Sequence, residues 1–120
     1  MQRAEVEADP LVAVRTASER TGCTVLLKGS TQYVATPGDA RVWLAVPGPG
    51  WSAQAGSGDV LAGACGTLLA AGLAPFQAAL AAASIQAMAA GQYAGPLPPQ
   101  DLAERMSHVV RGILRNSRGA

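Results

Sequence analysis

The residues best suited to chemistry form the run Gly56, Ser57, Gly58 and Asp59, which leads directly into an uncharged stretch with helical character. The first turn of a helix has backbone N–H groups without partners inside the helix, and the helix dipole favours negative charge there. Gly56 and Gly58 have no Cβ, so a ligand oxygen can approach the main chain closely. The run therefore predicts an anion site of the kind that holds phosphate.

Asp59 needs a separate explanation, because a carboxylate repels phosphate. It can instead accept the proton of a substrate hydroxyl that attacks the phosphate. The other interpretation is structural: Asp is common at helix starts, and Asp59 then only stabilises the helix. A single Gly-x-Gly-Asp pattern does not separate the two.

Lys28 and Gly29 form the second candidate, at the end of the apolar run from Thr24 to Lys28. A lysine that ends a buried strand can reach a nucleotide phosphate or lie near a base. Alternatively, its ammonium group simply lies in solvent. Neither a Walker phosphate loop nor a dinucleotide Gly-x-Gly-x-x-Gly occurs in the required strand-to-helix context.

Several other kinds of chemistry are not expected. Cys23 and Cys65 are far apart in the sequence and His108 is the single histidine, so we predict no metal site built from this chain alone. Nine Lys and Arg residues against eight Asp and Glu residues give a net charge of +1, which argues against a nucleic-acid or anionic-membrane partner.

The uncharged run from Val60 to Ala74 raises the question of a membrane span, which needs about 20 apolar residues. Pro75 interrupts the run, and much of it is Ala and Gly, so two closely packed helices are predicted instead. The first twenty residues contain charges and no apolar leader, which together with unpaired cysteines predicts a cytoplasmic protein.

The elements that must position these residues follow from turn and capping signals. Asp9 and Pro10 predict a helix start, and Gly22 its end. The pattern predicts strands over 24–28, 32–36 and 41–46, the last two as a hairpin, then a Gly- and Pro-rich loop over 47–58 and helices over 58–71, 75–92 and 100–115. We expect one small α/β domain over residues 1–120, with 1–8 and 116–120 flexible.

Two segments taken together resemble a known family. The runs LLKGSTQYVATPGD and AGSGDVLAGACGTLLAAGLAPFQAALAAA are similar, in order and spacing, to the ADP-dependent NAD(P)H-hydrate dehydratases of the ribokinase-like superfamily, over about residues 10–115. The resemblance implies a partial ribokinase-like fold, with a short strand plus a β-hairpin packed with about four helices. It also implies a repair enzyme that dehydrates the hydrated nicotinamide ring and restores NADH or NADPH. The implied cofactor is ADP or ATP, and Mg²⁺ can accompany the nucleotide.

The resemblance also assigns site residues. It implies that Asp59 faces the hydrated cofactor and assists reaction at its hydroxyl, with the amides of residues 56–58 stabilising phosphoryl charge. This chain departs from the family pattern at Gln32, at Ala45 and at the pair Gln86 and Ala87, where the family often has Thr, Asn and His-Gly. The nucleotide-binding residues that it implies are Lys28, Gly29, Ser30, Thr31, Gln32, Gly56, Ser57 and Gly58.

The family domain is more than twice as long as these 120 residues, and the part without a counterpart here would be N-terminal. We therefore expect the C-terminal part of such an enzyme, partnered by a complementing N-terminal half or by further copies of itself. A charged fraction of only 14% fits a chain that is covered by something else. Two alternatives stay open: a fragment of a related vitamin-precursor kinase, and a non-catalytic remnant that serves as an oligomerisation module.

Overall fold

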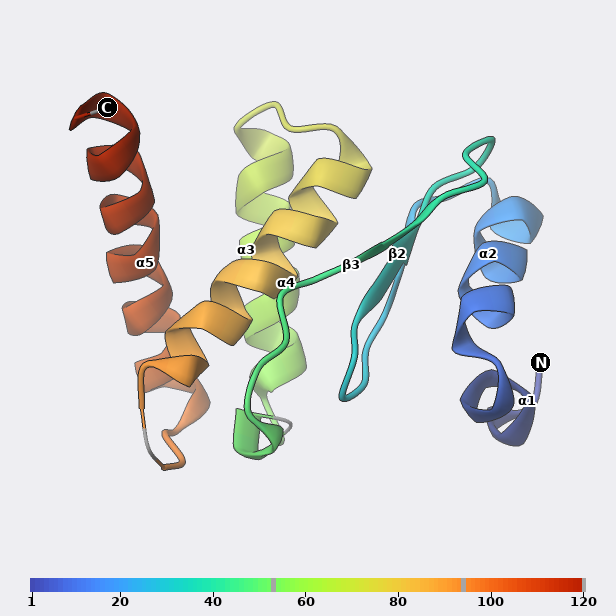
Figure 1. Ribbon diagram of the computed structural model, residues 1–120, viewed down its shortest axis with the longest axis horizontal. Helices are drawn as coiled ribbons and strands as arrows, with labels where there is room; N and C mark the ends of the chain where they lie inside the picture. Colours follow the sequence, from blue (N-terminus) through green and yellow to red (C-terminus); the bar gives the residue numbers. More distant parts are fainter. Residues whose placement is uncertain (53, 94, 120) are drawn as a thin grey trace.

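A computed structural model of the chain describes residues 1–52, 54–93 and 95–119 (Figure 1). Ala120, the end of the tail predicted to be flexible, lies outside the described residues. The predicted α/β class is confirmed, with three strands and five α-helices among the elements described. In order these are α1 (Arg3–Ala8), α2 (Pro10–Thr21), β1 (Val25–Leu27), β2 (Tyr33–Ala35), β3 (Val42–Leu44), the 3₁₀ turn η1 (Gly50–Ser52), α3 (Ser57–Ala70), α4 (Pro75–Gly91) and α5 (Pro99–Gly119).

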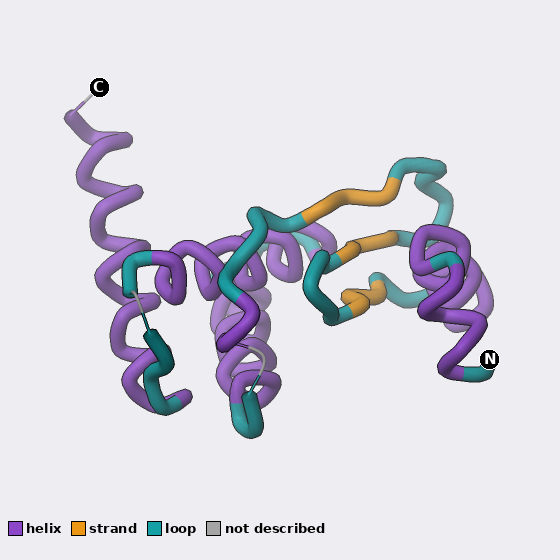
Figure 2. Tube along the Cα trace, turned by 60° about the horizontal axis from the view of Figure 1, so that its bottom comes forward, coloured by secondary structure: helices purple, strands orange, loops and turns teal. Residues whose placement is uncertain are grey.

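The three strands form one antiparallel sheet in the order β1-β2-β3. Val34 in the central strand lies opposite Leu26 of β1 and Trp43 of β3, and it is fully buried. The predicted hairpin of β2 and β3 is confirmed, and β1 joins it through a second antiparallel pairing. Figures 1 and 2 show the sheet between α1 and α2 at one end of the molecule and α3, α4 and α5 at the other.

Capping residues set the ends of α2 as the sequence predicts. The Asp9 carboxylate accepts a hydrogen bond of 3.1 Å from the backbone N–H of Val12, and Pro10 occupies the first helical position. Gly22 ends the helix in the left-handed region, with φ of 69°. Local side-chain chemistry therefore determines where this helix begins and ends.

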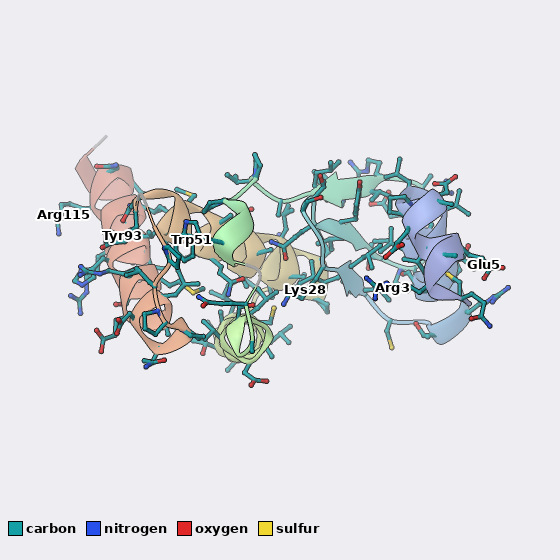
Figure 3. All side chains as sticks on the ribbon, turned by 90° about the horizontal axis from the view of Figure 1, so that it is seen from below. Arg3, Glu5, Lys28, Trp51, Tyr93 and Arg115 are labelled. Carbon is teal, nitrogen blue, oxygen red and sulfur yellow. The ribbon has the colours of Figure 1, made fainter. Side chains whose placement is uncertain are left out.

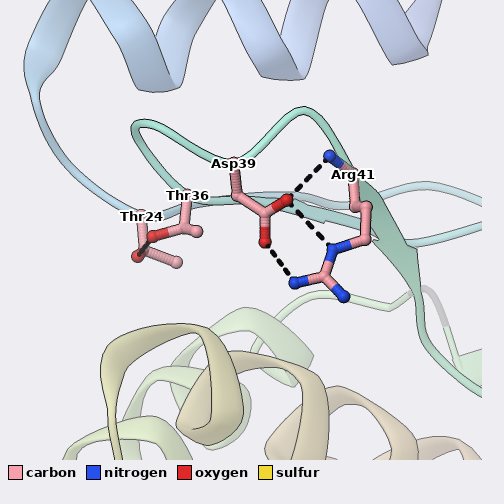
Figure 4. A network of polar contacts seen from close by, with 4 residues as sticks. All are labelled: Thr24, Thr36, Asp39 and Arg41. Atoms are coloured by element: carbon pink, nitrogen blue, oxygen red, sulfur yellow. Dashed lines mark hydrogen bonds and ion pairs between the residues drawn. The ribbon is translucent and has the colours of Figure 1, made fainter.

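Polar contacts hold the ends of the strands (Figure 4). The Asp39 carboxylate accepts three hydrogen bonds of 3.0 Å from Arg41, one from its backbone and two from its guanidinium. These bonds lower the pKa of Asp39 below its ordinary value. The hydroxyls of Thr24 and Thr36 lie 2.9 Å apart and connect the chain before β1 to the end of β2.

Two groups of buried residues form the core. One joins α4 to α5 through Ala89, Ala90, Leu102, Met106 and Val109, and the other joins the sheet to the helices through Ala45, Leu61, Ala82 and Ala83. The buried face of α4 consists mainly of alanine, which allows its neighbours to pack closely. None of the described helices has the length and apolar character that crossing a membrane requires.

Candidate functional site

The predicted phosphate-binding donors lie at the start of α3. Gly56 precedes the helix with φ of 90°, a conformation that favours glycine, and a Cβ added there would also lie 3.1 Å from Pro99 Cγ. The Ser57 N–H donates to the Gln54 carbonyl at 3.1 Å. In contrast, the N–H groups of Gly58 and Asp59 have no hydrogen-bond partner among the described residues. The first turn therefore has two donors available to a ligand.

Lys28 comes well before α3 in the sequence, and its side chain lies near the start of that helix. It follows β1, and a Cβ added at Gly58 would lie 3.2 Å from Lys28 Nζ. Figure 3 shows Lys28 in the middle of the molecule, between the strands and the helices. Within the described part of the chain, Lys28 forms no ion pair. An ammonium group next to the positive end of a helix, without a carboxylate beside it, favours an anion between the two.

Lys28 and Ser57 line a partly polar cleft of about 380 Å³, and Gly56, Gly58 and Asp59 are not among the residues that line it. Gln32 also lines the cleft, and its Oε1 is buried without a partner among the described residues. Thr31 lines a smaller neighbouring hollow of about 200 Å³ next to α1, which shares Lys28, Gly29 and Ser30 with the cleft. The residues that line the cleft are Lys28, Gly29, Ser30, Gln32, Ser52, Gln54, Ser57 and Gln86.

Asp59 does not line this cleft. Its exposed side chain borders a larger, mostly apolar groove of about 620 Å³ between α3, α4 and α5. Successive residues of an α-helix are rotated by about 100°, so the side chains of Ser57 and Asp59 leave α3 in nearly opposite directions. The first turn of α3 therefore separates a cationic cleft from a hollow with a carboxylate at its rim.

Sequence reasoning missed three residues of the cleft, Ser52, Gln54 and Gln86, and Gln86 is the buried one among them. It is only 6% exposed, and its Nε2 donates a hydrogen bond of 3.0 Å to the Ser57 carbonyl. The sequence marks Gln86 only as a departure from the family pattern. The sequence offers one signal: this glutamine is a polar residue inside an alanine-rich, uncharged helix.

Residues of α4 also hold the loop that leads to the site. The Val46 N–H donates to Ser84 Oγ at 3.2 Å, at the point where the chain leaves β3. A Cβ added at Gly48 would lie 3.0 Å from Ala87 Cβ and 3.1 Å from its Cα, so a side chain here would require the loop or α4 to shift. Further along the loop, the Gln54 side chain donates to the Leu97 carbonyl. The loop is thus fixed at its start by α4 and near its end by the segment before α5.

Comparison with known proteins gives consistent results. The family model described as NAD(P)H-hydrate dehydratase matches residues 1–109. The chain is 45% identical over 105 residues to the bifunctional NAD(P)H-hydrate repair enzyme Nnr of Mycobacterium leprae, covering 88% of this chain and 22% of that protein. It is also 45% identical over 87 residues to the ADP-dependent (S)-NAD(P)H-hydrate dehydratase of Neisseria meningitidis serogroup B, covering 72% of this chain and 29% of that protein.

A solved structure, that of Bacillus subtilis YxkO, has a TM-score of 0.78 and 20% identity, and the match covers 92% of this chain and 43% of that one. This likeness supports the fold and agrees with the predicted partial ribokinase-like α/β arrangement. The chain spans less than a third of the length of the two curated relatives described above.

Proposed function

The chain belongs to the NAD(P)H-hydrate dehydratase family, and from this premise we propose that it carries the phosphate site and the proton-accepting residue of a nucleotide-dependent dehydratase. The cofactor is ADP or ATP, and the substrate is hydrated NADH or NADPH. The observation that supports this most directly is the approach of Lys28 Nζ to the Gly58 backbone, beside two N–H groups that have no partner among the described residues.

The proposed chemistry uses both sides of the first turn of α3. The Asp59 carboxylate accepts the proton of the substrate hydroxyl while the hydroxyl oxygen attacks the terminal phosphorus of the nucleotide. The bond from that phosphorus to the leaving oxygen of the nucleotide breaks, and the N–H groups of Gly58 and Asp59 stabilise the charge on the transferred group, together with Lys28. The resulting phosphate ester then loses phosphate, and the adjacent ring carbon loses a proton, so that the ring double bond forms and the hydroxyl oxygen leaves with the phosphate.

The rest of the nucleotide would lie along the chain after β1. Ser30 and Gln32 line the same cleft as Lys28, and the buried Gln32 Oε1 is suited to accept a hydrogen bond from a sugar hydroxyl or a base amino group. Thr31 is assigned to the same nucleotide by the family resemblance alone, because it lines a neighbouring hollow instead.

The protein offers few ligands for Mg²⁺. The described residues contain no group of three or more His, Cys, Asp or Glu side chains that could hold a metal ion. Among the described residues that line the cleft and the apolar groove, Asp59 is the one carboxylate. Mg²⁺ often binds through substrate phosphates and one or two carboxylates, so an ion here would be held mainly by the nucleotide.

We further propose that a complementary segment completes the substrate pocket, because the curated relatives are several times longer than this chain. The two free cysteines fit a reducing compartment, which supports the cytoplasm as its location. Co-expression with the segment of the Neisseria meningitidis relative that this chain does not span would test the activity. Recovery of NADH absorbance from hydrated NADH, dependent on ADP or ATP, is the expected result.

Two variants make the test specific. In the complemented enzyme, Asp59→Asn should lower the rate by about 10²- to 10⁴-fold, the usual contribution of general base catalysis. Asp101→Asn is the matched control, since Asp101 is an exposed carboxylate in the first turn of α5 and lines neither hollow. Full activity of Asp59→Asn would contradict the role of Asp59, whereas a stable phosphorylated alcohol as the product would indicate a kinase instead.

A further inference from the structure

We propose that Gln86 is a positioning residue that orients the Ser57–Gly58 peptide group toward the phosphate. The proposal rests on the proposed function, because the phosphate site is the one described above. It concerns how a side chain of α4 controls a backbone donor of α3. Nothing in the cleft requires Gln86 itself to touch the reacting atoms.

The geometry follows from the planarity of the peptide bond. The Ser57 carbonyl and the Gly58 N–H belong to one rigid group and point in opposite directions. Gln86 Nε2 donates to the Ser57 carbonyl at 3.0 Å, so it also restrains the direction of the Gly58 N–H. That N–H is one of the two donors without a partner among the described residues, and it belongs to the residue that Lys28 Nζ approaches.

The burial of Gln86 supports a specific role. A carboxamide is costly to bury unless it forms hydrogen bonds, and among the described residues Gln86 is the one polar side chain of α4 that is buried. The Gln86 side chain also lines the cleft. An alanine at this position would match the rest of the buried face, so simple packing does not explain the glutamine.

The same turn of α4 fixes the loop before α3. Ser84 accepts a hydrogen bond from Val46, and Ala87 contacts the Gly48 backbone. Gln86 then holds the first residue of α3, so α4 fixes both the start and the end of the segment that forms the site. A helix carbonyl normally accepts from the N–H four residues later, so the Gln86 bond is additional to the helix and its loss should leave α3 intact.

The test compares Gln86→Leu and Gln86→Glu with the wild-type chain and with Gln92→Leu. Gln92 is an exposed glutamine directly after the same helix, and its side chain forms no hydrogen bond with the described residues, so it is the matched control. The first measurement is the ¹³C chemical shift of the Ser57 carbonyl, which reports its hydrogen bonding. The second is the dissociation constant of inorganic pyrophosphate, followed through the amide signals of Gly58 and Asp59.

Gln86→Leu should shift the Ser57 carbonyl signal and weaken pyrophosphate binding by roughly 2- to 10-fold, as expected for one hydrogen bond. Gln86→Glu should weaken binding further, because an ionised carboxylate cannot donate to the carbonyl and repels the anion. Gln92→Leu should match the wild type. An unchanged Ser57 signal, or unchanged affinity in Gln86→Leu, would overturn the role of Gln86, whereas a wild-type chain that binds no pyrophosphate would contradict the proposed phosphate site itself.

Discussion

Substituting Gly58 with alanine should separate the stability of the chain from its capacity to bind phosphate. The φ of Gly58 lies outside the left-handed region, and the residue belongs to the first turn of α3, so the backbone accepts a side chain there. The added Cβ would lie 3.2 Å from Lys28 Nζ. It would therefore occupy the space in which a phosphate oxygen has to meet the ammonium group and the helix N–H groups.

Gly58→Ala should leave the stability of the fold unchanged or slightly higher, and it should lower the affinity for phosphate. Lys28 is exposed and the contact involves the far end of a flexible side chain, so a shift of a few tenths of an ångström relieves the contact at small cost. Alanine in place of glycine stabilises a helix interior by up to about 1 kcal/mol, with less expected in the first turn. Loss of one hydrogen bond to a charged group costs about 1.5–3 kcal/mol, which corresponds to roughly 10- to 150-fold in the dissociation constant.

The assay combines thermal unfolding with pyrophosphate titration of the full chain. Gly58→Ala should unfold at the same temperature as the wild type or a few degrees higher, since about 1 kcal/mol corresponds to roughly 3–6 °C for a chain of this size. Its affinity for pyrophosphate should fall at least about tenfold. Gly63→Ala is the control, because a Cβ at Gly63 of the same helix meets nothing within 4 Å. Wild-type affinity in Gly58→Ala would refute the proposed convergence of Lys28 and α3.

Three further predictions concern the rest of the chain. Gly48→Ala should destabilise the fold by about 1–3 kcal/mol in chemical denaturation, because its Cβ would lie 3.0 Å from Ala87 Cβ. The lowered pKa of Asp39 contributes stability that is present above its unfolded pKa, about 3.9, and is lost as pH falls through the folded value. As the pH is lowered from about 6 to 3, the thermal unfolding temperature should therefore fall less in Asp39→Asn than in the wild type. Cys65, whose thiol pKa is raised by burial, should react with a thiol reagent more slowly than exposed Cys23.

Local signals account for most of what the sequence predicts correctly. The start of α2 at Pro10, its end at Gly22 and the start of α4 at Pro75 each depend on one capping or turn residue, which acts within a few positions of the chain. The sequence predicts no helix over residues 3–8, where the structure has α1. Its signals were local too: the Gln2 N–H donates to Glu5 at 2.7 Å, and Arg3 pairs with a glutamate four residues later at 2.7 Å.

The strands agree in position and differ in length. The sequence predicts five or six residues for each, whereas the structure pairs three residues in each strand. Apolar character continues beyond the paired residues, because Ala45 after β3 is buried against the helices, and its N–H donates to the Gln32 carbonyl at 3.1 Å. Hydrophobic patterning reports burial, and burial extends beyond the three residues that each strand pairs.

The candidate site shows most clearly what local reasoning lacks. Nothing near Lys28 indicates that its ammonium group reaches Gly58, thirty residues later, and only the resemblance to a family joined the two motifs. The physical connection runs through α4, which comes after both in the sequence. Gln86 holds the first residue of α3, and Ala87 admits Gly48 because its side chain is a single methyl group. The donors of the site are therefore specified by the glycine-rich run at residues 56–59, but their directions are specified by α4, which follows it in the sequence. Substitutions on α4 should therefore alter the affinity of a cleft to which, among the described residues, α4 contributes Gln86.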